Sequence, residues 1–392
     1  DGTPFPVFQT TDDYEQDQFS QEFQITGVSF DERLRWTGGL YYFEEAASDV
    51  GLIEGVPPPF PFVIGGETDN DTFAVYGEAT FDATDRLHLT AGLRYTDETK
   101  RFSPIAEALA LNLPPLPPFQ ILAPGERSID ISEITYRATV AYDLADSVMG
   151  YFTVSEGFKS GGFVIRTTTP RPDPATFEPE FVTLFEAGLK ADFPDIGLRL
   201  NAAAFFSDYE DIQVAANPPG EIGTVTANAA DGEIKGVELE FTYVPASALL
   251  ISGALGYQDA QYTKVNSNAN VTVTLNDEFI RTPEWSWNLG TSYLLELGNG
   301  GSLTPRLDWV YKAETHFEPA NNVLVAQDAY HVLNVSATYR DSTEKWRVAL
   351  GVNNLTDEDY LIAADSNGAI GYALGVFSRP RNWYLSVERA FE

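Results

Sequence analysis

The sequence predicts an all-β protein, specifically a transmembrane antiparallel β-barrel, on the strength of three observations. Apolar and polar residues alternate with a period of two along many segments of the chain. The connections between these segments alternate between short turns and long polar stretches. Aromatic residues recur where the segments run into the short turns. Together these patterns are typical of barrels that cross a membrane with strands.

The period-two alternation defines the expected strands. In ITYRATVAY the residues Ile134, Tyr136, Ala138, Val140 and Tyr142 share one face. A soluble β-sandwich produces the same alternation, so the period alone leaves both folds open. We expect about fifteen strands, near residues 17–30, 33–46, 72–82, 86–98, 130–143, 148–157, 179–193, 197–208, 224–244, 249–263, 280–296, 302–313, 328–340, 345–355 and 376–391.

The connections favour the barrel over the sandwich. Short turns are expected at FDER, DATDR, DLADS, DFPDIG, VPASA, LGNGGS and RDSTEK. Between them lie long segments near 47–71, 99–129, 158–178, 209–223, 264–279, 314–327 and 356–375. An outer-membrane barrel has this asymmetry, with tight turns at the periplasmic rim and extended loops outside the cell. A sandwich has no reason to sort its loops by length in this way.

A ring of aromatic residues is expected at the short-turn rim. Aromatic side chains are favoured where one end is apolar and the other is wet, as at a membrane interface. The expected membrane girdle consists of Phe30, Phe81, Tyr142, Phe193, Tyr243, Tyr339 and Phe391. The first and last strands both run toward this rim, whereas antiparallel barrels are even-numbered. We therefore expect either further strands on the N-terminal side or one spurious strand.

The composition excludes several classes of function. The 392 residues include 24 Lys and Arg against 58 Asp and Glu, and a net charge of −34 argues against a nucleic-acid partner. The absence of Cys removes disulfides and thiolate metal sites. The three histidines, His88, His316 and His331, are scattered. We therefore expect no metal site, no cofactor and no enzymatic activity.

Seven stretches, in this order and spacing, resemble the C-terminal part of the TonB-dependent outer-membrane receptors. They are YFTVSEGFKSGGF, FEPEFVTLFEAGLKADF, FFSDYEDIQV, DGEIKGVELEFTY, RTPEWSWNLGTSY, GVNNLTDEDY and RNWYLSVERAF. The family has a twenty-two-stranded barrel, a plug domain and a TonB box. The resemblance implies that residues 1–392 form a partial barrel domain, with the plug domain and TonB box absent.

The resemblance also implies a location and an activity. It predicts the bacterial cell outer membrane and energy-coupled, TonB-dependent uptake of a scarce bulky ligand, most often a ferric siderophore. The expected partners are outer-membrane lipid and lipopolysaccharide, the ligand, and TonB through the missing plug region. Three alternatives stay open: a passive porin-like or structural barrel, a barrel enzyme using the outward-facing His331, and a soluble all-β binding protein.

Charged residues at alternate positions are expected to face the lumen, because a lipid face tolerates charge poorly. The lumen-facing residues are predicted to be Glu78, Arg94, Arg137, Glu186, Arg199, Glu238 and Arg306. We expect most of them to pair across neighbouring strands rather than to touch a ligand.

The ligand-binding candidates lie on the long loops and their flanks, where the family recognises ligands with aromatic and charged residues. They are Phe158, Lys159, Tyr209, Phe317, Tyr360 and Tyr372, and each is also explained as a rim or packed loop residue. The sequence shows no dense basic or aromatic cluster along these loops. GFKSGG (157–162) lacks the strand-to-helix context of a phosphate loop, so we interpret it as a strand reaching the rim.

Overall fold

A computed structural model describes the chain except residues 1–7, 56–60, 110, 113–114, 117–118, 168–169, 217, 219–223, 268, 270, 272, 369–370 and 392. The described residues form an eighteen-stranded antiparallel sheet and four two-stranded sheets. In the large sheet β5, β8 and β18 are two-residue pieces, which leaves fifteen long strands. None of the described helical segments is long and apolar enough to cross a membrane.

The long strands, in chain order, are β1 (Phe8–Ser29), β2 (Leu34–Gly55), β3 (Phe62–Asp82), β4 (Leu87–Pro104), β9 (Arg127–Ala145), β10 (Val148–Lys159), β13 (Glu180–Phe193), β14 (Leu198–Ala216), β15 (Val225–Ala246), β16 (Leu249–Val265), β17 (Trp285–Tyr293), β19 (Ser302–Lys312), β22 (Tyr330–Arg340), β23 (Trp346–Asn353) and β26 (Asn382–Arg389). The short elements are β5 (Glu107–Ala108), β6 (Leu111–Asn112), β7 (Pro115–Leu116), β8 (Phe119–Gln120), β11 (Gly162–Phe163), β12 (Thr176–Phe177), η1 (Pro194–Ile196), β18 (Leu295–Glu296), β20 (Thr315–His316), η2 (Val323–Val325), β21 (Ala326–Gln327), β24 (Leu361–Asn367) and β25 (Tyr372–Phe377).

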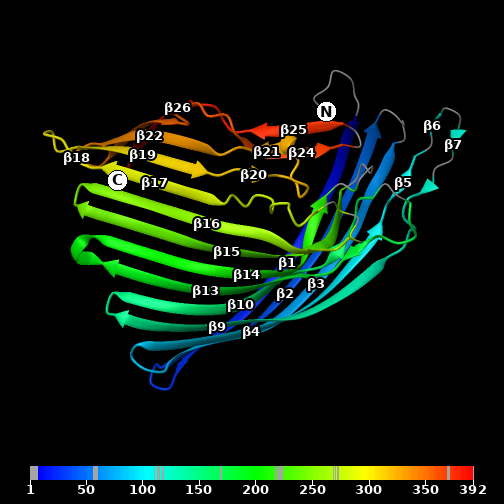
Figure 1. Cartoon of the computed structure of the whole chain (residues 1–392), viewed down its shortest axis with the longest axis horizontal. Helices are drawn as coiled ribbons and strands as arrows, with labels where there is room; N and C mark the ends of the chain where they lie inside the picture. The colour runs from blue at the N-terminus through cyan, green and yellow to red at the C-terminus, as the bar shows by residue number, and fades with distance from the viewer. Residues whose placement is uncertain are drawn as a thin grey trace.

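Each long strand pairs antiparallel with the next one along the chain, and the sheet curls into an open trough (Figure 1). Within the described residues β1 pairs only with β2, and β26 pairs only with β23. An odd number of antiparallel strands makes β1 and β26 run the same way, toward the short-turn rim, so these two edges do not match each other. The all-β antiparallel prediction is confirmed, and so is the expected number of strands.

Short and long connections alternate as predicted, but several strand bounds differ. The segment near 47–71 was expected to be a loop, whereas β2 continues to Gly55 and β3 begins at Phe62. The segment near 209–223 is also partly strand, since β14 continues to Ala216, and residues 217 and 219–223 lie outside the described part. In these extensions the backbone pairing continues, but apolar and polar residues no longer alternate. A prediction based on alternation therefore ends the strands too early.

The last expected strand is likewise revised. Residues 376–391 were expected to form one strand, but β26 spans Asn382–Arg389 and Tyr372–Phe377 form β25 of a separate hairpin with β24. Pro380 lies between the two segments. Proline has no N–H for a strand ladder, which explains the break.

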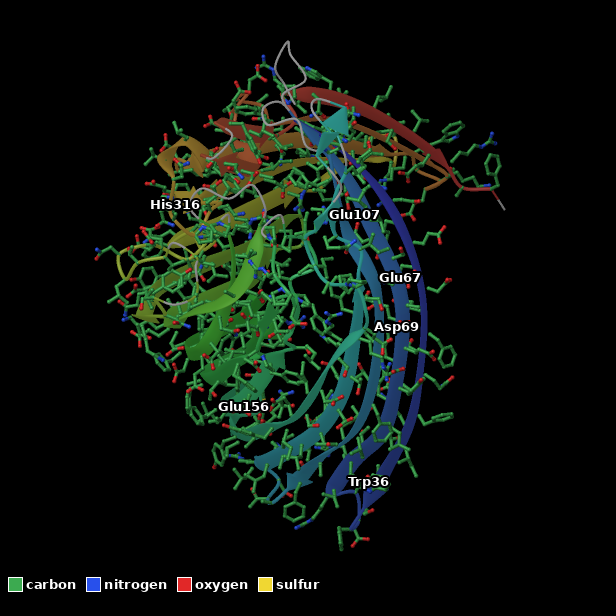
Figure 2. The ribbon with its side chains drawn as sticks, turned by 90° about the vertical axis from the view of Figure 1, so that its right-hand side faces the viewer. Trp36, Glu67, Asp69, Glu107, Glu156 and His316 are labelled. Atoms are coloured by element: carbon green, nitrogen blue, oxygen red, sulfur yellow. The ribbon has the colours of Figure 1, made fainter. Side chains whose placement is uncertain are left out.

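On β3 the outer face changes from apolar to acidic toward the long-loop end. On β3 the outward residues run from Phe81 to Phe73, and the next outward positions are Asp71, Asp69 and Glu67. Figure 2 places Trp36 near the short-turn end, with Asp69 and Glu67 toward the loops. Residues 73–81 are nine positions, which matches the nine to eleven residues of a membrane-crossing strand.

Most of the expected girdle residues lie at outward strand ends beside the short turns. Phe193 pairs with Leu198, which pairs with Tyr243, so these three share one row. Two positions differ from the expectation. Phe30 lies in the turn after β1 with φ of 54°, and Phe391 follows the end of β26. Both are well exposed, and the Phe391 ring contacts the Arg389 guanidinium at 5.0 Å.

Aromatic rings cover glycines on directly opposite strands. Tyr76 lies over Gly39, and a Cβ added at that glycine would be 2.3 Å from the ring. Tyr151 lies over Gly188 in the same way. A strand glycine has no side chain to pack, and an opposing ring restores the contact. These pairs tie neighbouring strands together on the inner face.

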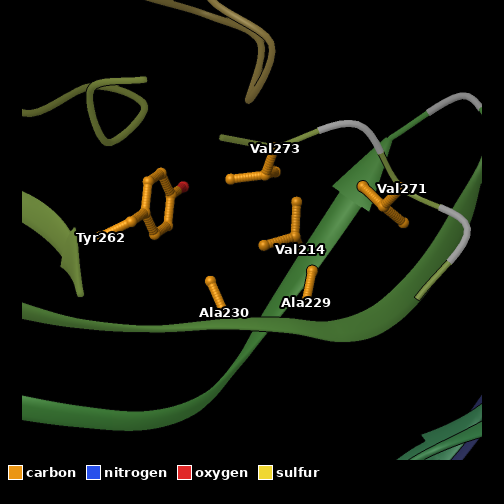
Figure 3. Close-up of a cluster of buried hydrophobic side chains, with 6 residues drawn as sticks. All are labelled: Val214, Ala229, Ala230, Tyr262, Val271 and Val273. Carbon is orange, nitrogen blue, oxygen red and sulfur yellow. The ribbon is translucent and has the colours of Figure 1, made fainter. Parts of the chain in front are cut away.

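Two hydrophobic clusters anchor the long loops on the inner face. The first contains Val214, Tyr262, Val271 and Val273, where the segment after β16 folds over β14 and β15 (Figure 3). The second contains Ile64, Phe102, Ala106, Ile121 and Leu122, with Phe163 and Ile165 packed against it. Both clusters lie at the long-loop end of the trough. The loops therefore fold inward and narrow its mouth.

Candidate functional site

The candidate site is the inner face of the trough at its long-loop end. There the segment between β10 and β13 folds back against the wall. Lys100 on β4 donates to the carbonyl of Gly161 at 2.9 Å, and Ser160 donates to Glu98. Arg166 bonds Asp49 on β2 at 2.8 Å and Asp12 on β1 at 3.1 Å. Three strands thus hold one loop in the mouth.

Gln213 on β14 fastens the two ends of the same loop. Its Nε2 amide donates to the carbonyls of Ser160 at 2.9 Å and Glu178 at 3.0 Å. Asn228 on β15 donates to the Glu178 carbonyl at 2.9 Å and accepts from the Glu178 N–H at 2.7 Å. Because backbone groups at both ends of the loop are satisfied by fixed side chains, the loop is held in one position.

A pocket of about 360 Å³ lies beneath this loop. Its lining includes Lys100 from β4, Lys159 from β10, Gln213 from β14, and the rings of Phe163 and Phe177. Gly161 permits the close approach, since a Cβ there would be 2.5 Å from the Phe177 carbonyl oxygen. The pocket size lies within the range of small-molecule sites.

The seven residues predicted to face the lumen all lie on the inner face of the sheet, and most have partners there. Arg199 pairs with Asp192 on the neighbouring strand at 2.8 Å, and Tyr151 donates to Glu186 at 2.7 Å. The remaining contacts join Glu78 with Arg137 at 4.0 Å and Arg306 with Asp308 at 2.5 Å, while Glu238 lines a groove of about 270 Å³.

Arg94 has the most specific environment on this wall. Its guanidinium lies 5.6 Å from the ring centroids of both Tyr41 and Tyr76. Its Nε donates to Thr96 at 3.1 Å. A guanidinium held between aromatic faces gains cation–π stabilisation and loses little entropy. Arg94 thus presents a fixed positive charge partway along the trough.

The six residues expected to bind ligand do not lie together in the structure. Lys159 and Tyr209 lie on the inner face, near the mouth. Phe158 points to the outer face, where it stacks on Phe181 at 6.2 Å. One position along the strand thus separates an inward lysine from an outward ring.

The other three expected ligand residues have local partners in the loops. Phe317 lies under the Arg281 guanidinium at 5.8 Å, and Tyr360 stacks on Tyr330 at 4.2 Å. Tyr372 donates to Asp365 within the β24–β25 hairpin at 2.8 Å. Burial and this carboxylate raise the pKa of Tyr372 to about 12, so the phenol keeps its proton at neutral pH.

Sequence reasoning missed four residues that line the pocket, namely Lys100, Gln213, Phe163 and Phe177. The polar Lys100 follows the apolar part of β4, and Gln213 lies in a segment expected to be a loop. Only the strand extensions bring them together. GFKSGG behaves as expected: β10 ends at Lys159, the glycines allow close packing, and the described residues 160–167 contain no helix. No group of three or more His, Asp or Glu is placed to hold a metal ion in the described part of the chain.

Comparison with protein families decides the class of this barrel. The model for "TonB dependent receptor-like, beta-barrel" matches residues 1–355. The chain belongs to this family. The recognition and the fold class predicted from the sequence are therefore confirmed.

Several known receptors are similar in sequence to this chain. The pesticin receptor of Yersinia enterocolitica is 24% identical over 329 residues, which is 81% of this chain and 44% of the relative. The ferrichrome outer membrane transporter/phage receptor of Escherichia coli is 26% identical over 237 residues, 59% of this chain and 29% of the relative. The chain thus spans less than half the length of these relatives.

Solved structures share the fold of the family barrel. The ferric yersiniabactin uptake receptor of Yersinia pestis aligns with a TM-score of 0.84 and 19% identity, covering 99% of this chain and 56% of that one. The siderophore receptor PiuA of Acinetobacter baumannii aligns with a TM-score of 0.72 and 18% identity, covering 96% and 56%. At these identities the likeness concerns the fold.

Proposed function

We propose that this chain forms the barrel wall of an energy-coupled outer-membrane receptor that imports a ferric siderophore. The observation that carries the proposal is the mouth itself. Long loops fold onto the inner wall and enclose a pocket, held by Lys100, Gln213 and Arg166. A wide passive pore has no need for such a pocket, whereas capture of a scarce ligand requires one. The relatives named for siderophore and ferrichrome uptake support the same function.

The two faces of the sheet support a place in the outer membrane. The outward band on β3, residues 73–81, is long enough to cross the hydrocarbon core. The girdle residues Phe81, Tyr142 and Phe193 would mark the periplasmic interface, and the acidic positions beyond Phe73 would stand outside the cell among lipopolysaccharide. The charged inner residues would line the lumen. Coupling to TonB would run through a plug, the domain that the family pairs with such a barrel.

Uptake measurements test the function. We expect deletion of the gene to abolish import of at least one ⁵⁵Fe-labelled siderophore, and deletion of TonB to abolish the same import. Import that survives loss of TonB would support the alternative, a passive barrel, and would contradict the proposal. Import that is unchanged by deletion of the gene itself would remove this protein from siderophore uptake altogether.

The enzymatic alternative has little support in the environment of His331. The contacts recorded for its ring are with Trp287, Trp309 and Tyr311, at centroid distances of 4.8 to 6.1 Å. A hydrolytic triad needs a hydroxyl and a carboxylate bonded to the imidazole. An esterase assay on the folded protein tests this directly, and we expect no turnover.

A further inference from the structure

The pocket under the 160–177 segment is cationic in a chain that is strongly acidic. Acidic residues outnumber basic ones by 58 to 24. Nevertheless, the charged residues lining the pocket are Lys100, Arg101 and Lys159, without any carboxylate. A local concentration of one sign against the overall charge attracts the opposite sign specifically to that point. The pocket is therefore suited to an anion.

The three cations are not equally available. Arg101 borders the pocket, but its side chain lies at an outward position of β4 and bonds the outward Asp71 at 2.6 Å, so its charge is not presented to the pocket. Lys100 donates to the Gly161 carbonyl and lies 3.9 Å from Glu98. Lys159 is exposed and has no ion pair among the described residues. Glu180 lies opposite it on β13, where its carboxylate accepts a hydrogen bond from the Gln213 N–H at 2.6 Å. Lys159 is therefore the charge most able to bond an incoming group, with Lys100 beside it as a partly neutralised second donor.

The remaining lining adds apolar faces and a rigid frame. Phe163 contacts Phe102 of the buried cluster at a centroid distance of 5.6 Å, so its ring is anchored. Phe177 belongs to β12, which pairs with β11 within the same loop. Gln213 fixes the carbonyls at both ends of the segment. A site whose side chains are already ordered loses less entropy when it binds a ligand.

We propose that this pocket binds the anionic edge of a metal chelate, with carboxylate or phenolate oxygens at Lys159 and Lys100. The apolar part of the chelate lies against Phe163 and Phe177. The inference rests on the proposed uptake function and narrows it, because it selects negatively charged chelates over neutral or cationic ones. Selection follows from the charges, since an ammonium group strengthens a hydrogen bond to an ionised oxygen and repels a cation.

Binding to whole cells at ice temperature tests the inference separately from transport. The probes are three ⁵⁵Fe chelates of different charge: ferric citrate, which is anionic, ferrichrome, which is neutral, and ferrioxamine B, which is cationic. The variants are introduced into the native gene, in cells whose other receptors for these probes have been deleted. They are Lys159→Glu, Lys159→Gln and Lys159→Arg, with Lys235→Gln as the matched control.

We expect wild-type cells to prefer the anionic chelate. Lys159→Glu should weaken its binding by about tenfold or more, Lys159→Gln should weaken it less, and Lys159→Arg should retain most of it. Lys235 pairs with Asp259 at 3.2 Å on the outer face, away from the pocket, so its variant should bind like wild type. Heat-modifiable migration on a gel verifies that each variant is folded.

The outcomes separate this inference from the uptake function. If wild-type cells prefer the neutral or cationic probe, or if folded Lys159→Glu binds the anionic probe unchanged, the cationic pocket is not the recognition site while uptake stands. If wild-type cells bind none of the three probes, the inference is overturned, because an anionic chelate is then not recognised, whereas the uptake function is judged by the import measurements on the gene and TonB deletions.

Discussion

The hydroxyl group of Tyr76 on β3 donates a hydrogen bond of 2.6 Å to the carboxylate of Glu22 on β1, two strands away. It reaches Glu22 by passing over Gly39 of the intervening strand β2. Gln24 donates to the same hydroxyl at 2.8 Å, and Arg94 stacks on the Tyr76 ring. One tyrosine thus joins four strands of the wall, and a glycine makes room for it.

Gly39→Ala should destabilise the barrel by about 1–3 kcal/mol. The new Cβ would be 2.3 Å from the Tyr76 ring, so the ring must move and lose its bond to Glu22. The free energy of unfolding in detergent measures the effect. Gly38→Ala is the control, because its Cβ would have no neighbour closer than 3.8 Å. Equal effects at Gly38 and Gly39 would contradict the role of the ring.

Leu239→Arg should impair insertion by about 2–4 kcal/mol, the cost of a cation on the lipid face near mid-membrane. Leu239 shares the outer face with Val237, which is 49% exposed. Thr242→Arg should be mild, because Thr242 pairs with the inward Arg199 and faces water. The yield of heat-modifiable barrel in lipid vesicles distinguishes them. Equal tolerance of the two variants would contradict the proposed assignment of the faces.

Gln213→Ala should release the segment that covers the pocket. The variant loses the amide that donates to the carbonyls of both Ser160 and Glu178 and so joins the two ends of the segment, while Asn228 still donates to the Glu178 carbonyl. Limited proteolysis of intact cells should then cleave within residues 160–179 at least several times faster. Gln261→Ala, whose side chain bonds Glu233 instead, should leave the rate unchanged. An unaltered rate for Gln213→Ala would mean that the loop is held by other contacts.

Asp341→Asn should lower stability at neutral pH and lose its effect in acid. The carboxylate accepts from the Thr343 hydroxyl and from the Trp346 N–H at 2.8 Å, and these bonds lower the pKa of Asp341 below 3.8. Because the pKa is lowered in the folded state, the ionised carboxylate stabilises the fold at pH values above 3.8. This contribution disappears as the pH falls through the lowered pKa. Thermal unfolding of both proteins between pH 7 and about pH 2 measures the difference.

A control for the acid experiment lies in another short turn. Asp85→Asn also replaces a turn carboxylate by an amide, but the described residues donate no hydrogen bond to the Asp85 carboxylate. We expect its thermal unfolding to follow wild type at every pH. A gap between wild type and Asp341→Asn that persists at the lowest pH would contradict the role of the ionised carboxylate.

The sequence predicted those features of the barrel that depend on local pattern. Alternation assigned Arg94, Glu186 and Arg306 to one face, because side chains of a strand point to opposite sides in turn. Short turns such as LGNGGS were recognised because glycine and asparagine supply the backbone conformations that tight turns need. The parts of the strands beyond the apolar band were not predicted, because strands made of polar residues pair without a pattern of alternating hydrophobicity.

The candidate site was predictable only in part. Phe158 and Lys159 were both expected as loop residues that bind ligand, but both belong to the end of β10, where Lys159 faces inward and Phe158 faces outward. No basic cluster was visible along the loops. Lys100 and Lys159 lie on different strands but line the same pocket. The intervening strand β9 pairs with β10 only as far as Ser155, and beyond that point the loop folds inward.

By itself, the sequence determined the all-β class, the order of the strands, the alternation of short and long connections, and which residues share a face. These properties depend on neighbours within a few positions, so a linear pattern records them. Tertiary structure alone decided that Lys100, Lys159, Phe163 and Gln213 meet at one pocket. Their meeting depends on the curvature of the sheet and on a loop packed by Phe102 and Gln213, contacts between segments distant in the chain that leave no trace in local spacing.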